Sequence, residues 1–216
     1  MKCLCHTTKC RFIPLFEFIP GAAGIHQLGG EVPEEFILPA HNLVTSFQYI
    51  GFIDNRDNAF SWLPFKVHLI CPIYLNFEKV FLDYSNPFSP VLMNADELSD
   101  ADSSFDELSG DSIIVYDSVK FYTVRSSVYG NGIGHTGVPG WYQAPGIPRC
   151  PKTNRIMKFL CQLNRQANVP AKYHNVIPEE SYHLQYFEEM NFWMDGDLYI
   201  FFEPESKTCC YIIQNT

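Results

Sequence analysis

The feature that most limits the fold of this chain is an order of turns and apolar segments that occurs twice. In each half, a Gly/Pro turn precedes an apolar segment ending in an amide or acid, and a second apolar segment then ends at proline. The first copy comprises residues 28–33, 47–54 and 67–72, and the second comprises 135–140, 157–164 and 198–204. Short apolar segments between Gly and Pro are typical of β-strands. The repeat therefore predicts two related, β-rich lobes.

Length and composition agree with a strand-rich fold. The 216 residues are sufficient for one domain or two closely packed lobes. The 18 Phe and 12 Tyr, with only 18% charged residues, favour strands over long surface helices. We predict an α+β fold, mostly antiparallel β, with two related lobes packed into one globular unit. The expected parts are a cysteine-containing leader (1–27), an N-terminal β lobe (28–94), an acidic linker or insertion (95–111) and a C-terminal β lobe (112–216).

Local patterns predict where the strands lie. The β-branched and aromatic runs at 47–53, 65–73, 77–84, 112–116, 119–128, 156–163 and 208–213 are each expected to be strands. Residues 178–190 are expected to contain a short helix that begins near a proline. Asp195-Gly196, between apolar runs, predicts a tight hairpin turn.

The negative charge is concentrated in one segment. Residues 96–111 (DELSDADSSFDELSGD) hold seven carboxylates and no base, and the rest of the chain has 17 acids against 15 bases. Nucleic-acid binding requires Lys/Arg stripes, which the sequence lacks, so we predict no nucleic-acid partner. A basic protein partner fits this charge, although most charge runs are only solvated surface. The candidate partner-binding residues are Asp96, Glu97, Asp100, Asp102, Asp106 and Glu107.

No secretory or membrane-spanning pattern is recognised. The apolar run 12–18 is interrupted by Pro14 and Glu17, and no segment approaches the ~20 apolar residues that a membrane helix needs. We therefore expect a cytoplasmic protein without a membrane partner, whose thiols are reduced. Cys71 and Cys161 then act as small hydrophobic residues inside strands.

The first ten residues contain the only metal-ligand cluster that the sequence indicates. Cys3, Cys5, His6 and Cys10 offer four soft ligands, which zinc prefers. The alternative is a terminus with free thiols. It is favoured because adjacent Cys5 and His6 rarely reach one ion and the usual two-pair spacing is absent. We predict no cofactor, with zinc as the metal to test.

Three further segments resemble a known family. They are Gly137-Val138-Pro139-Gly140-Trp141-Tyr142-Gln143, the strand 157–164 (MKFLCQLN) and the segment 193–202 (WMDGDLYIFF). Together they resemble the YwqG-like family of uncharacterised bacterial proteins. The resemblance is best over residues 128–213 and weaker over 28–73. It implies a mixed α/β fold of two related lobes and no established enzyme activity. Some members look like parts of toxin-immunity neighbourhoods, which implies binding.

A candidate ligand site is assembled from polar residues of the second half. His135 follows a glycine-rich loop and is the strongest candidate base, and Gln143 and Gln162 are candidate ligand contacts. Gln162 and Asn164 share one strand face, where their amides either line a cleft or hydrogen-bond a loop backbone. Asp195 and Asp197 are explained by turn chemistry. No nucleophile motif is found, so an enzyme is disfavoured and no catalytic residue is assigned.

The predicted function is a non-enzymatic cytosolic protein-binding module. In its specific form it is an immunity-type protein that binds a basic toxin or another basic partner through the acidic segment. The alternative is a small-ligand binder or hydrolase-type enzyme that uses a cleft between the lobes, near His135, Gln143 and Gln162. A pocket there with a perturbed histidine and convergent amides would favour the alternative.

Overall fold

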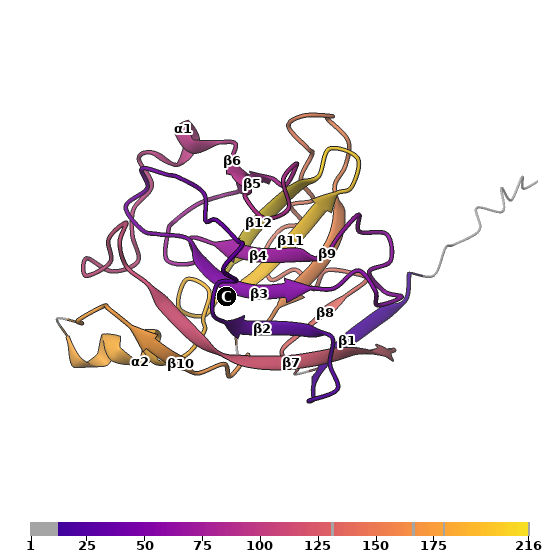
Figure 1. The fold of residues 1–216 in the computed structure, drawn as a ribbon, viewed down its shortest axis with the longest axis horizontal. Helices are drawn as coiled ribbons and strands as arrows, with labels where there is room; N and C mark the ends of the chain where they lie inside the picture. The colour runs from indigo at the N-terminus through magenta and orange to yellow at the C-terminus, as the bar shows by residue number, and fades with distance from the viewer. Residues whose placement is uncertain (1–12, 131, 166, 179, 216) are drawn as a thin grey trace, which may run out of the picture.

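All strands of the described chain belong to one antiparallel sheet. The computed structural model describes residues 13–130, 132–165, 167–178 and 180–215. The main path of the sheet runs β4-β3-β2-β7-β1-β8-β9-β11-β12-β5-β6, and β10 pairs with one edge of β7 (Figure 1). The strands are β1 Leu15–Pro20, β2 His26–Gly30, β3 Gln48–Ile53, β4 Val67–Cys71, β5 Val80–Asp83, β6 Val91–Leu92, β7 Ile114–Ser126, β8 Gly134–Thr136, β9 Lys158–Leu163, β10 Ala171–His174, β11 Asp197–Glu203 and β12 Thr208–Gln214.

The predicted α+β fold of two lobes is wrong. The strands of the first repeat, β3 and β4, lie near one end of the path, and β9 and β11 of the second repeat lie beyond β7, β1 and β8. β5 comes from the first half of the chain, yet it pairs with the final strand β12. The repeated pattern identifies segments that form strands, but strand edges pair with whichever partner the fold brings alongside. One hydrogen-bonded sheet therefore replaces the two lobes.

Helices contribute little to the fold. The described chain contains α1 Ala95–Leu98, the 3-10 helix η1 Ser181–His183 and α2 Leu184–Glu188. The helix expected within 178–190 is thus reduced to two short turns. In the part of the chain that the structure describes, no helix has the length and hydrophobicity that crossing a bilayer requires.

The sheet curls because its strands carry bulges and one strand is long. β7 spans 13 residues and pairs with β1, β2 and β10 along its length. Register shifts interrupt the pairings of β2 with β7, of β3 with β4 and of β9 with β11, and a bulge bends its strand and increases its twist. At the shift in β3, Gly51 has φ +128° and an added Cβ would lie 2.1 Å from the Gln27 carbonyl oxygen. Only glycine fits this bend.

The described part of the expected cysteine-containing leader, residues 1–27, contains β1 and the start of β2. β1 lies between β7 and β8, and β2 lies on the other edge of β7. Pro20 and His26 both pair with Phe121, so the turn between β1 and β2 crosses over β7 at this residue. Gly24 permits the crossing, because an added Cβ would lie 2.3 Å from the Phe121 backbone. The turn at residues 21–24 (GAAG) thus passes close to the β7 backbone.

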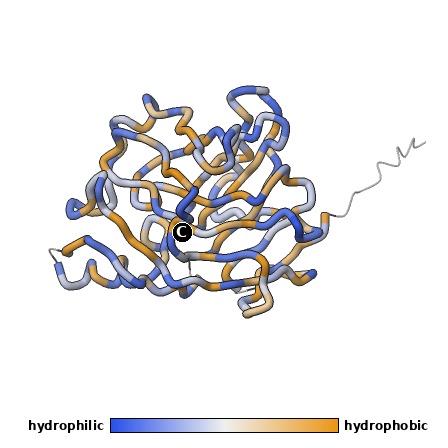
Figure 2. The backbone as a smooth tube through the Cα atoms, in the orientation of Figure 1, coloured by the Kyte–Doolittle hydropathy of each residue, from blue (hydrophilic) through white to orange (hydrophobic). Residues whose placement is uncertain are grey.

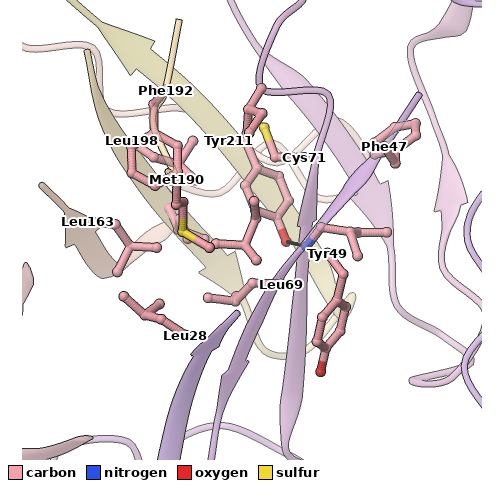
Figure 3. Packing of buried hydrophobic residues seen from close by; sticks show 14 of the residues in the cluster. Leu28, Phe47, Tyr49, Leu69, Cys71, Leu163, Met190, Phe192, Leu198 and Tyr211 are labelled. Carbon is pink, nitrogen blue, oxygen red and sulfur yellow. Dashed lines mark hydrogen bonds between the residues drawn. The ribbon is translucent and has the colours of Figure 1, made fainter. Parts of the chain in front are cut away.

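The main core lies on the inner side of the curl. Strands β2–β4 face β9, β11 and β12 across it, and apolar segments alternate with polar ones along the chain (Figures 1 and 2). Figure 3 shows the inward side chains of Leu28, Leu69, Leu163 and Tyr211 meeting at its centre. The Tyr211 hydroxyl accepts the Ile70 amide hydrogen at 3.4 Å. Side chains from both halves of the chain therefore form one core.

A smaller apolar cluster covers the outer face of β9, β11 and β12. Tyr199 and Phe201 of β11 project to this face, whereas their neighbours project into the main core. Residues 137–157 lie over the cluster and add Trp141, which stacks on Tyr199 with ring centroids 4.7 Å apart. β11 is buried on both faces, which explains its continuous apolar run.

Candidate functional site

The candidate site lies on the outer face of the sheet, where four polar side chains form one row. Glu17 of β1 pairs with His135 of β8, His135 pairs with Gln162 of β9, and Gln162 pairs with Tyr199 of β11. Directly paired residues of an antiparallel sheet project to the same face. The sheet therefore brings together His135 and Gln162, two of the three predicted ligand contacts.

Gln162 holds in place the segment that covers the outer cluster, residues 137–157. Its Oε1 accepts the Gly140 amide hydrogen at 2.8 Å, and its Nε2 donates to the Gly140 carbonyl at 3.3 Å. The Tyr199 hydroxyl donates to the same carbonyl at 2.7 Å. Asn164 donates from Nδ2 to the Gly132 carbonyl at 2.5 Å. Both amides thus satisfy loop backbone, as one interpretation of the sequence predicted, and at the same time they line a cavity.

This cavity has a volume of about 420 Å³ and lies between the row and the loops around it. Its size is within the range of small-ligand sites, roughly 300–1,000 Å³. The described lining consists of Tyr129, Gly130, Gly132, His135, Gly140, Trp141, Tyr142, Gln162, Asn164, Arg165 and Asp197. Aromatic rings, hydrogen-bond donors and hydrogen-bond acceptors therefore all line this cavity.

Asp197 is the buried charge of the cavity, with only 1% of its surface exposed. Its Oδ2 accepts from Gln162 Nε2 at 2.6 Å, and its Oδ1 accepts from the Arg165 amide at 2.9 Å. Burial raises the pKa of this carboxyl, and hydrogen bonds from the Arg165 amide, Gln162 and the Tyr142 side chain, together with the Arg165 charge, oppose that shift. A carboxylate has about four acceptor sites, so capacity remains for a ligand hydroxyl or amide.

His135 is held neutral. Only 4% of its surface is exposed, and its Nε2 lies 3.1 Å from the Val138 carbonyl oxygen, to which the ring nitrogen donates. Burial lowers its pKa to about 4, even though that hydrogen bond favours the charged form. The ring packs edge-on against Tyr129 with centroids 4.9 Å apart. At neutral pH its Nδ1 is therefore an acceptor.

Arg165 supplies the positive charge. Its guanidinium lies 5.8 Å from the centre of the Tyr142 ring, and its charge acts on Asp197. Burial raises the pKa of Tyr142, and the negative charge of Asp197 adds to this shift. Arg165 and Asp197 are the charged groups of the described lining, and their charges are opposite.

The third predicted contact, Gln143, lies outside this cavity. Its backbone amide donates to Gln214 Oε1 at 3.1 Å, and its Nε2 donates to the Asn215 carbonyl at 3.1 Å. Gln214 also donates to the Ala144 carbonyl at 3.1 Å. Gln143 thus fastens the covering segment to β12, and its side chain lines a separate hollow with Trp193.

The acidic segment is folded, and its carboxylates separate into two groups. Leu98, Phe105 and Leu108 are buried and fix the segment to the molecule. The exposed residues Glu97, Asp100 and Asp102 line a hollow of about 770 Å³ beside β5. Glu78, Lys79 and Arg149 line the same hollow. Asp96 is also exposed and lies next to Glu97 in α1. Asp106 and Glu107 lie at another hollow, beside η1. There the Glu107 carboxylate contacts His183 Nδ1 at 2.7 Å, so Glu107 faces inward.

The predicted zinc ligands Cys3, Cys5, His6 and Cys10 lie outside the described residues. Within the described ranges, no group of three or more His, Cys, Asp or Glu is arranged to hold a metal ion. The five cysteines of those ranges, Cys71, Cys150, Cys161, Cys209 and Cys210, are buried and unpaired.

Sequence reasoning missed Asp197 and Arg165 as site residues. Turn chemistry is an incomplete explanation of Asp197, because its carboxylate accepts hydrogen bonds from β9 and from the residue after Asn164. The expected positive φ angles of this turn belong to Trp193 and Met194 and not to Asp195-Gly196. One signal was present: Asp197 directly precedes the apolar run 198–202, and an acid beside a buried run requires buried partners.

Comparisons with protein-family models, curated proteins and solved structures find no significant match to this chain. The resemblance to the YwqG-like family therefore stays a prediction, and the site is interpreted from its own chemistry.

Proposed function

We propose that this protein binds a small, uncharged, hydroxyl-rich molecule, of which a monosaccharide is the simplest example, in the cavity beside Asp197. The observation that carries the proposal is a nearly fully buried carboxylate in the lining of an open cavity. Burying a charge is costly unless other groups satisfy it, and such groups are often functional. The Asp197 carboxylate accepts ligand hydroxyls, and the Arg165 guanidinium and the neutral His135 ring complement it.

The aromatic residues of the lining favour a ring-shaped ligand. Tyr129 and Tyr142 are exposed, and Trp141 is held flat on Tyr199 at an interplanar angle of 10°. Aromatic faces bind apolar ring surfaces, while the polar groups select the orientation. The proposed activity is binding, with the Asp197 carboxylate acting as a hydrogen-bond acceptor.

The test is a titration of the intact protein with a panel of monosaccharides, followed by NMR. We expect one or more of them to shift resonances of Asp197 and Tyr142. Asp197→Asn should weaken the affinity about tenfold or more, because a hydrogen bond to a charged group contributes about 1.5–3 kcal/mol. The exposed Tyr142→Ala variant should also weaken binding without unfolding the chain.

Asp195→Asn is the matched control, because Asp195 is an exposed carboxylate of the same turn. It should leave the affinity unchanged. If no sugar of the panel binds, or if Asp195→Asn weakens binding as much as Asp197→Asn, the proposal is refuted.

The acidic segment supports a second candidate, a binding site for a basic protein. Glu97, Asp100 and Asp102 line one hollow, and the segment that carries them is fixed by buried Leu98 and by Asn94. Asn94 Oδ1 accepts the Phe81 amide at 2.9 Å, and its Nδ2 donates to the Lys79 carbonyl at 2.9 Å. A carboxylate cluster held in place attracts a basic surface at a smaller entropic cost than a flexible run would. An immunity-type role belongs to this candidate.

We place both candidate functions in the cytoplasm. This placement is supported by the buried, unpaired thiols of the described chain, which are typical of a reducing compartment.

A further inference from the structure

A second cavity of the molecule is apolar and opens where β8 leaves the sheet. β8 pairs with β9 only through Gly134 and His135, so the first residues of β9 have no β8 neighbour. The gap between β1 and β9 contains a cavity of about 510 Å³. Its walls are Ile13, Pro14, Phe16, Ala59, Trp62, Thr136, Gly137, Val138, Pro139, Ile147, Ile156, Met157, Lys158, Phe159 and Phe201.

Several wall residues are apolar and yet exposed. Ile13 is 58% exposed, Ile147 is 53% exposed and Ile156 is 64% exposed. They surround an interior formed by Phe16, Phe159 and other apolar groups. Apolar surface gathered in a concave site is typical of ligand or partner binding.

Lys158 is the one charged group among the described wall residues. Its Nζ lies 3.8 Å from the centre of the Trp62 ring, and within the described part of the chain no carboxylate forms an ion pair with it. The Lys158 side chain is exposed at the edge of the cavity, and the partial burial of its ammonium lowers its pKa. A cation that has no ion-pair partner in the described chain attracts an anion.

We infer that this cavity binds an amphiphilic carboxylate, such as a medium-chain fatty acid, with its chain among the apolar walls and its carboxylate on Lys158. The walls match an alkyl chain, and the single cation at their edge matches one anionic head group. The site is independent of the polar cavity beside Asp197. The occupant is inferred from charge complementarity, since an uncharged apolar partner would leave Lys158 without a counter-ion.

The experiment is calorimetric titration of the full chain with decanoate and, separately, with the uncharged analogue decanol. We expect saturable binding of one decanoate, a change in Trp62 fluorescence, and an affinity at least tenfold greater than that of decanol. Adding or removing one methylene of the acid should change the affinity about fourfold, as expected for burial of one CH₂.

Lys158→Met removes the charge and retains an apolar stem over Trp62. It should lower decanoate affinity about tenfold and leave decanol affinity unchanged. Ile156→Glu places a competing carboxylate on an exposed wall residue and should weaken decanoate binding further. Lys66→Met is the matched control, because the Lys66 Nζ lies over another ring, Phe52, at 4.6 Å and outside the cavity.

Equal affinities for decanoate and decanol would overturn the inference, as would equal effects of Lys158→Met and Lys66→Met. Absence of saturable binding would also overturn it. A decanoate affinity that falls as the protein concentration rises would also overturn it, because the apolar walls would then be a contact with a second copy of the chain.

Discussion

At three places, a buried glutamine side chain makes hydrogen bonds to backbone amides and carbonyls that have no neighbouring strand to pair with. Gln48 Oε1 accepts the Ile114 amide at 2.9 Å and its Nε2 donates to the Ser112 carbonyl at 2.9 Å. Gln162 and Gln214 do the same for the segment that covers the outer face. An unpaired buried amide or carbonyl costs about 1–3 kcal/mol, so each such side chain stabilises irregular backbone. The amides near the strand ends of the repeated pattern thus have a structural role.

The buried, neutral histidines His135 and His68 make the free energy of unfolding depend on pH. Burial lowers the pKa of His135 and of His68 to about 4, whereas an unfolded histidine titrates near 6.5. Below pH 6.5 the unfolded chain therefore binds protons that the folded chain does not. The stability that these residues contribute is fully present above pH 6.5 and is lost as the pH falls towards 4.

We expect His135→Gln to reduce the loss of unfolding free energy between pH 7.5 and pH 5 by about 2 kcal/mol, because 1.36 kcal/mol corresponds to one pH unit per proton. Urea unfolding of both proteins at the two pH values measures this difference. Parallel pH dependences for the variant and the unsubstituted protein would contradict the assignment of a buried neutral His135.

At the scale of elements, strands were easier to predict than connections. The runs 47–53 and 156–163 contain β3 and β9, because β-branched and aromatic residues fit a pleated sheet. The two runs at 112–116 and 119–128 form one strand, β7, since the Asp117-Ser118 pair between them stays extended within the sheet. The hairpin between β11 and β12 was not predicted. Its turn lies between Glu203 and Thr208, and Lys207 in this turn has φ 56°.

The second candidate function, binding of a basic protein, can be tested by neutralising carboxylates of the acidic segment. We expect the triple variant Glu97→Gln/Asp100→Asn/Asp102→Asn to weaken binding of poly-L-lysine about tenfold at low salt, and to reduce its salt dependence. Three exposed ion pairs contribute about 0.2–1 kcal/mol each. Fluorescence anisotropy at two ionic strengths measures both effects.

A control triple changes the net charge by the same amount elsewhere. Glu34→Gln/Glu188→Gln/Glu189→Gln neutralises three exposed acids outside the acidic segment. If both triples weaken binding equally, the attraction depends only on net charge, and the hollow beside β5 has no special role.

At the scale of the whole molecule, the single sheet predicts a single folding unit. β5 pairs with β12, and β1 lies between β7 and β8, so neither half of the chain completes its own sheet. We expect one two-state unfolding transition. Variants that retain only Trp62 or only Trp193 should report the same urea midpoint, and the calorimetric and van't Hoff enthalpies should agree. Two separate midpoints would show that the chain unfolds in two parts.

The sequence by itself determined several of the strands, among them β3, β4 and β9, together with the mostly antiparallel character and the burial of Cys71 and Cys161. These properties depend on local composition and on short-range periodicity. It also indicated His135 and Gln162 as members of one site, because both belong to the polar residues that border apolar runs.

Only the tertiary structure decided which strands pair. Pairing depends on contacts between residues far apart in the chain, such as β5 with β12, and no local pattern encodes them. The pairing of β9 with β11 brings Arg165 and Asp197 together in one cavity, and Gln143 lines a different hollow. The early end of β8 opens the apolar cavity beside Lys158. Both cavities arise from three-dimensional packing of segments whose sequences, taken singly, indicate only strands and turns.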